Sequence, residues 1–162
     1  MLNLSCAGGV TATLQHGGKI LLKQTGAIAD FSTTSLNGTD VSPYINTAFS
    51  VADVVKVDGH YALKSPLSVP KHKMLCGYID FMPIRENTAD PHGISTGQPQ
   101  CSLQVMMPNE STDNAISIGL YASVKNLMIC HPLQSVPPRA MAPTIYAPYL
   151  GAAIENVQLN LS

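Results

Sequence analysis

The clearest pattern of hydrophobic and polar positions lies between residues 54 and 77, where short apolar runs alternate with chain-breaking residues. The apolar runs are 54–57, 61–63, 67–69 and 74–76. Asp58-Gly59, Ser65-Pro66 and Pro70 separate them. Strands of three or four residues between tight turns are typical of a fold that bends at short intervals. An Asp-Gly pair between alternating apolar residues is also typical of a β-hairpin, so this segment alone leaves a hairpin and a solenoid open.

A helix is predicted directly before these runs. Thr39, Asp40 or Ser42 can cap its start, and Pro43 falls where a first-turn proline is tolerated. Its apolar face, at i, i+3, i+4 spacing, is Tyr44, Ile45, Ala48, Phe49 and Ala52. The first coil of a solenoid exposes apolar side chains and unpaired backbone. We therefore expect the helix to cover that end.

The first 25 residues contain a second alternating pattern. Val10, Ala12 and Leu14 alternate with polar residues, Gly17-Gly18 predicts a turn, and the run 20–22 is apolar again. This pattern predicts a hairpin or a swapped β-arm over residues 1–25. Such a unit either links the chain to a larger particle or covers the end of the solenoid as an N-terminal strand.

An internal repeat lies in the C-terminal half. Residues 124–129 (Val-Lys-Asn-Leu-Met-Ile) align with residues 154–159 (Ile-Glu-Asn-Val-Gln-Leu), 30 residues further along. Similarity at a fixed period is typical of a solenoid, and the repeated Asn126 and Asn156 suit a sharp bend because asparagine tolerates the left-handed region. With the pattern at 54–77, the repeat favours an all-β solenoid over a hairpin.

The rest of the chain predicts further strands and long loops. Residues 78–82 and 103–107 are predicted strands, each ended by a proline. The polar stretch 85–100 and the proline-rich stretch 131–143 are predicted loops. Long ordered loops often carry function.

Residues 26–77 resemble the opening of the pectate-lyase-like right-handed parallel β-helix that many phage tailspikes carry. The residues that carry the resemblance are Gly26-Ala27, Asp40, Ile45, Ala48, Val55, Val57, Gly59, Tyr61, Pro66-Leu67, Leu75 and Gly77. The chain departs from the family pattern where Asp30 is the one Asp of the loop and where Asp58 replaces a common proline. The resemblance implies an all-β, right-handed parallel β-helix with an N-terminal capping helix.

On this basis we expect three regions. Residues 1–25 are a β-arm that links to the particle, residues 26–53 are a loop and the capping helix, and residues 54–162 are β-helix coils. Since the second copy of the repeat ends at Leu159, the last coil would lack a cover. We expect the chain to be the N-terminal part of a longer protein, or a trimer or another chain to cover that end.

Composition limits the possible functions. Charged residues make up 12% of the 162 residues and the net charge is −1, which gives no basic surface for nucleic acid. No stretch is long enough to span a bilayer as a helix, and no signal peptide is evident. Since Cys6, Cys76, Cys101 and Cys130 show no C-x-x-C spacing, we expect buried thiols rather than a metal site, although two disulfides stay possible.

Candidate chemistry is sparse. Glycoside hydrolysis needs two carboxyl groups roughly 5–10 Å apart. The carboxyl groups that lie close in sequence are Asp80, Glu86 and Asp90, and separately Glu110 and Asp113. Solvated loop carboxylates are the simpler interpretation for all but Asp80, which the strand pattern directs outward. We therefore assign no catalytic, carbohydrate-binding or metal-binding residue and expect no cofactor. His60 and His72 flank turns, where we expect them to be exposed.

The tyrosines are the other candidates, because an exposed ring can stack on a sugar, although half-buried strand tyrosines are more common. They are Tyr61, Tyr78, Tyr121, Tyr146 and Tyr149. The resemblance implies a phage tailspike or tail fibre in the virion tail, made in the host cytoplasm without a signal peptide. Its expected partners are two further copies in a homotrimer, other tail proteins, and a bacterial surface polysaccharide that it recognises or degrades. The alternatives are a secreted polysaccharide lyase or hydrolase on the same fold, and a purely structural β-solenoid module.

Overall fold

The chain is mostly β-structure, with a single α-helix in the part that the structure describes. A computed structural model describes residues 2–5, 11–14, 18–77, 101–108, 111–133 and 142–161. The elements in chain order are β1 (Leu2–Ser5), β2 (Thr11–Leu14), β3 (Gly18–Leu21), the 3-10 helix η1 (Leu22–Thr25), α1 (Ser42–Val51), β4 (Ala52–Val57), β5 (His60–Leu63), β6 (Leu67–Val69), β7 (Met74–Gly77), β8 (Ser102–Val105), β9 (Ile116–Ile118), β10 (Ser123–His131), β11 (Ile145–Tyr146) and β12 (Ala153–Leu161). The predicted all-β class is confirmed, whereas the predicted strand over residues 78–82 lies outside the described residues.

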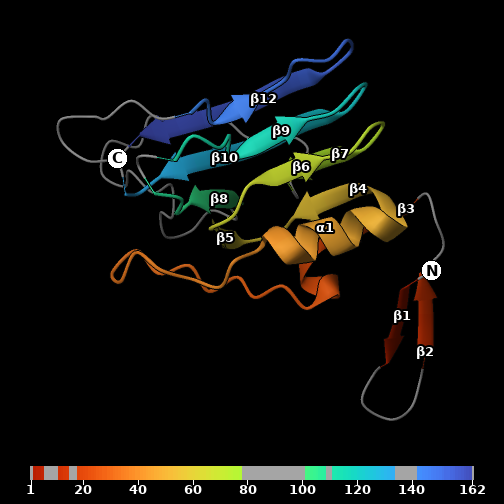
Figure 1. The fold of residues 1–162 in the computed structure, drawn as a ribbon. Helices are drawn as coiled ribbons and strands as arrows, with labels where there is room; N and C mark the ends of the chain where they lie inside the picture. The colour runs from red at the N-terminus through yellow and green to blue at the C-terminus, as the bar shows by residue number, and fades with distance from the viewer. Residues whose placement is uncertain are drawn as a thin grey trace.

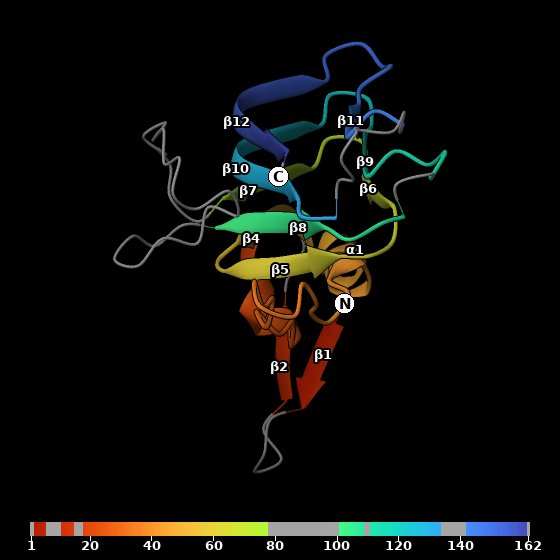
Figure 2. The ribbon, with the colours of Figure 1, turned by 90° about the vertical axis from the view of Figure 1, so that its left-hand side faces the viewer.

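The strands from β3 onward pair in parallel. One sheet has the order β3-β4-β7-β10-β8-β5, with β12 also beside β10, and a second sheet has the order β6-β9-β11. Figure 1 shows these strands stacked above α1. In the turned view of Figure 2, β5 and β8 face the viewer, while β6, β9 and β11 lie on another side of the core.

The larger sheet curls at β10. Ser123–Lys125 pair with β7, whereas Met128–Cys130 pair with β8. Between these two arms, Asn126 has a φ of 51°, a left-handed conformation that turns the strand. One strand therefore belongs to two faces of a curved parallel sheet.

The pairing excludes the hairpin at Asp58-Gly59. β4 pairs with β3 and β7, and β5 pairs with β8, so the two strands that flank this turn do not pair with each other. Gly59 is nevertheless required, because a Cβ there would lie 2.8 Å from the Cβ of Ala29. The Asp-Gly turn therefore redirects the chain from one face to the next.

The core consists of apolar side chains that stack from strand to strand. Ile20, Val55, Leu75 and Val124 are successive register partners, and each is at most 1% exposed. Tyr61, Leu103 and Ile129 form a second such column, as do Leu67 and Ile116 on the third set of strands. Each fully buried apolar side chain contributes about 1.5–3 kcal/mol relative to an exposed one.

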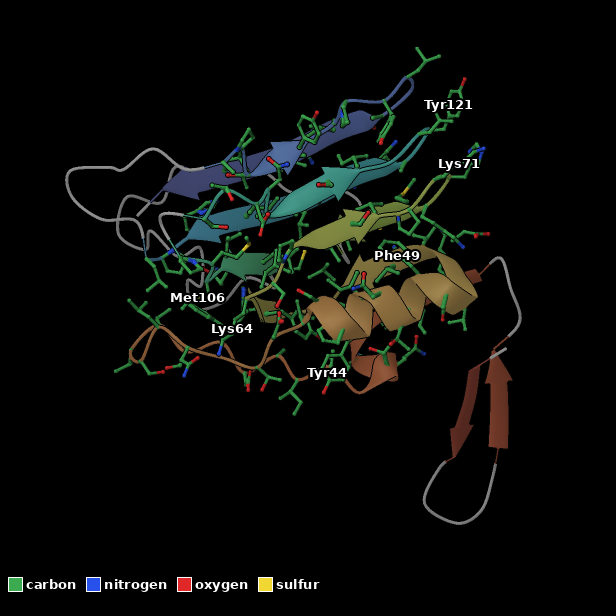
Figure 3. All side chains as sticks on the ribbon, viewed as in Figure 1. Tyr44, Phe49, Lys64, Lys71, Met106 and Tyr121 are labelled. Atoms are coloured by element: carbon green, nitrogen blue, oxygen red, sulfur yellow. The ribbon has the colours of Figure 1, made fainter. Side chains whose placement is uncertain are left out.

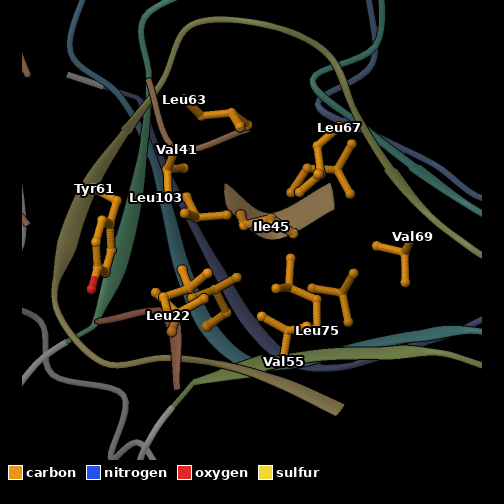
Figure 4. Packing of buried hydrophobic residues seen from close by; sticks show 14 of the residues in the cluster. Leu22, Val41, Ile45, Val55, Tyr61, Leu63, Leu67, Val69, Leu75 and Leu103 are labelled. Atoms are coloured by element: carbon orange, nitrogen blue, oxygen red, sulfur yellow. The ribbon is translucent and has the colours of Figure 1, made fainter. Parts of the chain in front are cut away.

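α1 covers one end of this core, as the sequence predicts. Ile45, Ala48 and Phe49 are buried, whereas Ala52 is the first residue of β4 rather than a helical residue. Figure 4 shows Ile45 in the middle of side chains that come from the surrounding strands, among them Leu63, Leu67, Leu75, Val55 and Leu103. Figure 3 shows Phe49 on the side of α1 that faces the strands.

Residues 1–25 contain a hairpin, as predicted, but it does not join the two apolar runs that the pattern indicated. β2 pairs antiparallel with β1, which the sequence pattern did not predict, and β3 pairs in parallel with β4. Ile20 and Leu22 are buried in the main core. The reason is that β4 offers β3 a long parallel edge and an apolar interior, which outweighs the local turn signal of Gly17-Gly18.

The 30-residue repeat is confirmed by the register of β10 and β12. Val124 pairs with Ile154, and Ile129 pairs with Leu159. Asn126 and Asn156 share a φ of 51°, and the Asn156 Nδ2 donates to the Asn126 Oδ1 at 2.9 Å. Asparagine therefore supplies both the bend and a bond between successive bends.

We expect Asn126→Ala to lower the free energy of unfolding by about 2–3 kcal/mol. A left-handed alanine costs about 1–2 kcal/mol, and the lost amide bond costs about 1 kcal/mol. Asn126→Gly keeps the backbone conformation accessible and is the control. Urea denaturation of both variants measures the effect. Equal losses for alanine and glycine would show that the left-handed conformation is not the cause.

Candidate functional site

The five candidate tyrosines have different environments. Tyr61 is 1% exposed in the core, which contradicts an exposed sugar contact there, and Tyr78 lies outside the described residues. Tyr121, Tyr146 and Tyr149 are 53%, 47% and 59% exposed. The three exposed tyrosines lie in or beside the turns that join the β6-β9-β11 sheet to the larger sheet, so this region is the candidate ligand surface.

The hydroxyl of the buried Tyr61 has a hydrogen-bond partner. The Tyr61 O–H donates to the Asp58 Oδ1 at 2.7 Å, and the Lys23 Nζ lies 3.7 Å from the Asp58 Oδ2. Burial, together with the neighbouring Asp58 carboxylate, raises the pKa of Tyr61 above its usual range. The Asp58–Tyr61 pair is therefore part of the structure of the turn.

Tyr121 belongs to a column of left-handed residues, His72, Tyr121 and Gly151, which we call the turn column. The rings of His72 and Tyr121 are parallel within 2°, with centroids 5.6 Å apart. A Cβ on Gly151 would lie 2.2 Å from the Tyr121 Cδ1, so the Gly151 backbone packs against the ring. Figure 3 shows Tyr121 and Lys71 at the same end of the molecule.

The turn column restricts access to the Tyr121 ring. His72 precedes Tyr121 by one turn of the stack and Gly151 follows it by one turn, since β6-β9-β11 and β7-β10-β12 are neighbours in these orders. Tyr121 therefore has protein neighbours on its His72 and Gly151 sides, yet the residue is 53% exposed. A sugar can reach the exposed part of the ring and its hydroxyl, while these two neighbours restrict stacking.

Tyr146 is better placed for stacking. It pairs with Ser117 on β9, and Ser117 pairs with Ser68 on β6. Ile116 and Leu67, which precede Ser117 and Ser68 in the chain, are buried in the core. Since successive side chains of a strand point to opposite faces, Ser68, Ser117 and Tyr146 lie on the outer face of the sheet. We call Ser68, Ser117 and Tyr146 the outer tyrosine face. It combines one half-exposed aromatic ring with hydroxyl groups.

Most carboxylates in the described part of the chain contact other groups of the protein. Asp80, Glu86, Asp90 and Glu110 lie outside the described residues, and Asp113 is exposed. The remaining carboxylates accept hydrogen bonds or form ion pairs within the protein, namely Asp30, Asp40, Asp53, Asp58 and Glu155. These contacts hold loops and strands together.

Asp40 joins the start of α1 to the turn after β5. Its carboxylate accepts bonds from the Ser42 N–H and O–H, from the Lys64 N–H at 2.9 Å and from the Ser65 O–H at 2.8 Å. Burial alone would raise the pKa of Asp40, but these hydrogen bonds together hold it below its ordinary value of 3.8. The ionised carboxylate therefore stabilises the fold.

We expect the free energy of unfolding to fall in acid because the Asp40 carboxylate becomes protonated. Because its folded pKa is lowered, its contribution is present above the ordinary value of 3.8 and is lost as the pH falls further, through the folded pKa. Asp40→Asn should therefore reduce the loss of unfolding free energy between pH 6 and acid. Denaturant titrations of both proteins at a series of pH values measure this. An unchanged dependence on pH would contradict the role of Asp40.

His60 and Ser102 form a pair that the sequence did not predict. His60 was expected to be exposed, but it is only partly exposed and its Nδ1 lies 2.8 Å from the Ser102 Oγ. The Gln104 Nε2 also donates to the Ser102 Oγ at 2.8 Å. Ser102 is fully buried, so this hydrogen-bonded group is part of the interior. His72 is exposed, as predicted.

A small pocket lies beside His131. Its lining includes Met107, Asp113, His131 and Thr144, and its volume is about 10 Å³, close to that of one water molecule. The His131 Nε2 lies 2.8 Å from the Thr144 Oγ1, and burial lowers the pKa of His131. The pocket is too small for a sugar.

No metal site is found in the described residues. They contain no group of three or more His, Cys, Asp or Glu that could hold an ion. Cys76, Cys101 and Cys130 are buried thiols, as expected, and Cys6 lies outside the described residues. Among the described helices, none is long and apolar enough to cross a membrane.

Comparison of the chain with family models, with curated proteins and with solved structures finds no match.

Proposed function

We propose that this chain is the N-terminal part of a phage tailspike or tail fibre and contains the first coils of a right-handed parallel β-helix. In this proposal the β1-β2 hairpin attaches to the particle. The coils trimerise, and their outer surface recognises a bacterial surface polysaccharide. The main support for this proposal is the strand pairing. β4, β5 and β6 do not pair with each other but pair in parallel with β7, β8 and β9.

The order in which the strands pair supports the proposed β-helix. β4, β5 and β6 form one coil, β7, β8 and β9 form the next, and each strand pairs in parallel with its counterpart. The two arms of β10 take the first two positions of a third coil, and β11 takes the last. α1 covers the end where the first coil begins, as a capping helix would.

The small residues behind the family resemblance have structural roles. Gly26 has a φ of 85°, Gly59 packs against Ala29, and Gly77 leaves no room for a Cβ beneath Asn126. Leu67, after Pro66, starts β6 and is buried. These roles support the resemblance, because they are requirements of coiled parallel strands.

Polysaccharide recognition rests on the outer tyrosine face. An aromatic ring can cover the apolar face of a sugar, and hydroxyl groups can bond to its rim. The exposed Tyr146 beside Ser117 and Ser68 offers both. Degradation has less support, because the described carboxylates form contacts within the protein.

Solution mass and glycan binding test this function. We expect light scattering to give three times the chain mass of 17.2 kDa. We expect a glycan array to show binding that Tyr146→Ala reduces about tenfold, which corresponds to a loss of about 1.4 kcal/mol. Tyr121→Ala is not a suitable control, because it also removes the turn column.

Other outcomes favour the alternatives. A monomer that cleaves polysaccharide would favour a secreted lyase or hydrolase, and a stable oligomer without glycan binding would favour a structural β-solenoid module. In addition, Tyr146→Ala with unchanged glycan binding would exclude the outer tyrosine face as the contact.

A further inference from the structure

β12 exposes side chains that are buried at the same positions in every earlier coil. Ile154 and Leu159 are 48% and 52% exposed, whereas their register partners Val124 and Ile129 are fully buried. β12 pairs with β10 on one side, and no described strand pairs with its other side. In Figure 1 it lies at the end of the stack opposite α1.

We propose that this surface binds one parallel β-strand with a defined pattern. We call the surface the β12 edge, and its residues are Ile154, Glu155, Asn156, Val157 and Leu159. The bound strand has apolar residues opposite Ile154, Val157 and Leu159, an asparagine opposite Asn156, and a basic residue opposite Glu155. The proposal rests on the proposed function, because it treats β12 as one coil of a longer β-helix.

The bend in β12 requires a partner that bends at the same place. Asn156 is left-handed like Asn126 below it, and its Nδ2 donates to the Asn126 Oδ1 at 2.9 Å. The Asn156 Oδ1 is then the acceptor that repeats this bond one strand further. An asparagine side chain in the bound strand provides the matching donor.

A second copy of β12 in antiparallel pairing does not fit this bend. With the two Asn156 residues opposite each other, Ile154 would face Gln158 and Val157 would face Glu155. Apolar inward positions would then meet polar outward positions, and the column of buried side chains would not continue. Parallel pairing in register places apolar residues on apolar residues at all three positions and also aligns the two bends, as it does between β10 and β12.

The charge on β12 selects the residue opposite Glu155. The Lys125 Nζ lies 2.9 Å from the Glu155 Oε2 across the β10–β12 pair, and the Glu155 side chain is 59% exposed. Opposite charges on directly paired residues are favourable and like charges are unfavourable. A lysine or arginine in the bound strand therefore fits, and a glutamate does not.

The test extends the chain by one designed coil. A copy of residues 132–161 is added after Leu161, since the repeat spacing is 30 residues, with the copy of Glu155 changed to lysine. A matched variant keeps glutamate there, and a control variant has serine in place of the copies of Ile154, Val157 and Leu159. Hydrogen exchange measures the β12 amides that face away from β10.

We expect the lysine extension to slow exchange of these amides by at least about tenfold, the glutamate extension to slow it less, and the serine extension to leave it unchanged. No protection by the lysine extension would overturn the proposal, as would equal protection by all three. Protection that appears in the unextended chain as its concentration rises would also overturn it, because a second copy would then be the occupant.

These results are separate from the glycan and mass measurements. Failure of glycan binding with protection by the lysine extension would reject the proposed function but keep the β12 edge. Glycan binding by a trimer, without protection by the lysine extension, would support the proposed function and reject the β12 edge as a strand-binding surface.

Discussion

Gly77→Ala is expected to reduce the free energy of unfolding by at least about 3 kcal/mol, at the upper end of overpacking substitutions. A Cβ at this position would lie 2.0 Å from the backbone oxygen of Asn126 and 2.6 Å from the Cys101 Sγ. The backbone of β10 must therefore move away, which also disturbs the bend at Asn126. Thermal denaturation should show a loss of about 6–12 °C.

Gly18→Ala is the matched control for Gly77→Ala. Gly18 is also a strand glycine, but no atom lies within 4 Å of its added Cβ. We expect its stability to be unchanged or raised by up to about 1 kcal/mol, because alanine reduces the entropy of the unfolded chain. Equal losses at both positions would show that close approach between coils is not what requires Gly77.

Ile45→Ala is expected to cost about 2–5 kcal/mol. Ile45 is fully buried and lies where α1 meets the inward side chains of several strands (Figure 4). Removing its side chain leaves a cavity between the helix and the strands, and neither can move to fill it without losing other contacts. Urea denaturation measures the loss of stability.

Ile28→Ala is the control for Ile45→Ala, because Ile28 is 55% exposed. We expect a change of at most about 0.5 kcal/mol, which is typical of surface substitutions. If Ile45→Ala were equally mild, α1 would not be a stabilising cover of the core. An accompanying rise in binding of an apolar dye would indicate that the end of the core has become exposed.

The sequence by itself determined the local elements and the repeat. The breaks at Asp58-Gly59, Ser65-Pro66 and Pro70 delimit β4 to β7 because these residues favour turns over strand pairing. The face of α1 follows from the spacing of Ile45, Ala48 and Phe49. The 30-residue spacing of Asn126 and Asn156 predicted that β10 and β12 pair in register, because both residues form a left-handed bend at the same point of the strand.

Only the tertiary structure decided which strands pair and which polar groups are buried. Asp58-Gly59 suits a hairpin, but β4 pairs with β7 and β5 pairs with β8. These pairings exclude the hairpin, and local sequence does not predict them because they join residues far apart in the chain. For the same reason β3 joins β4 rather than β2. The burial of Tyr61 and Ser102, and the packing of Tyr121 against His72 and Gly151, depend on residues far apart in sequence, which local periodicity does not encode.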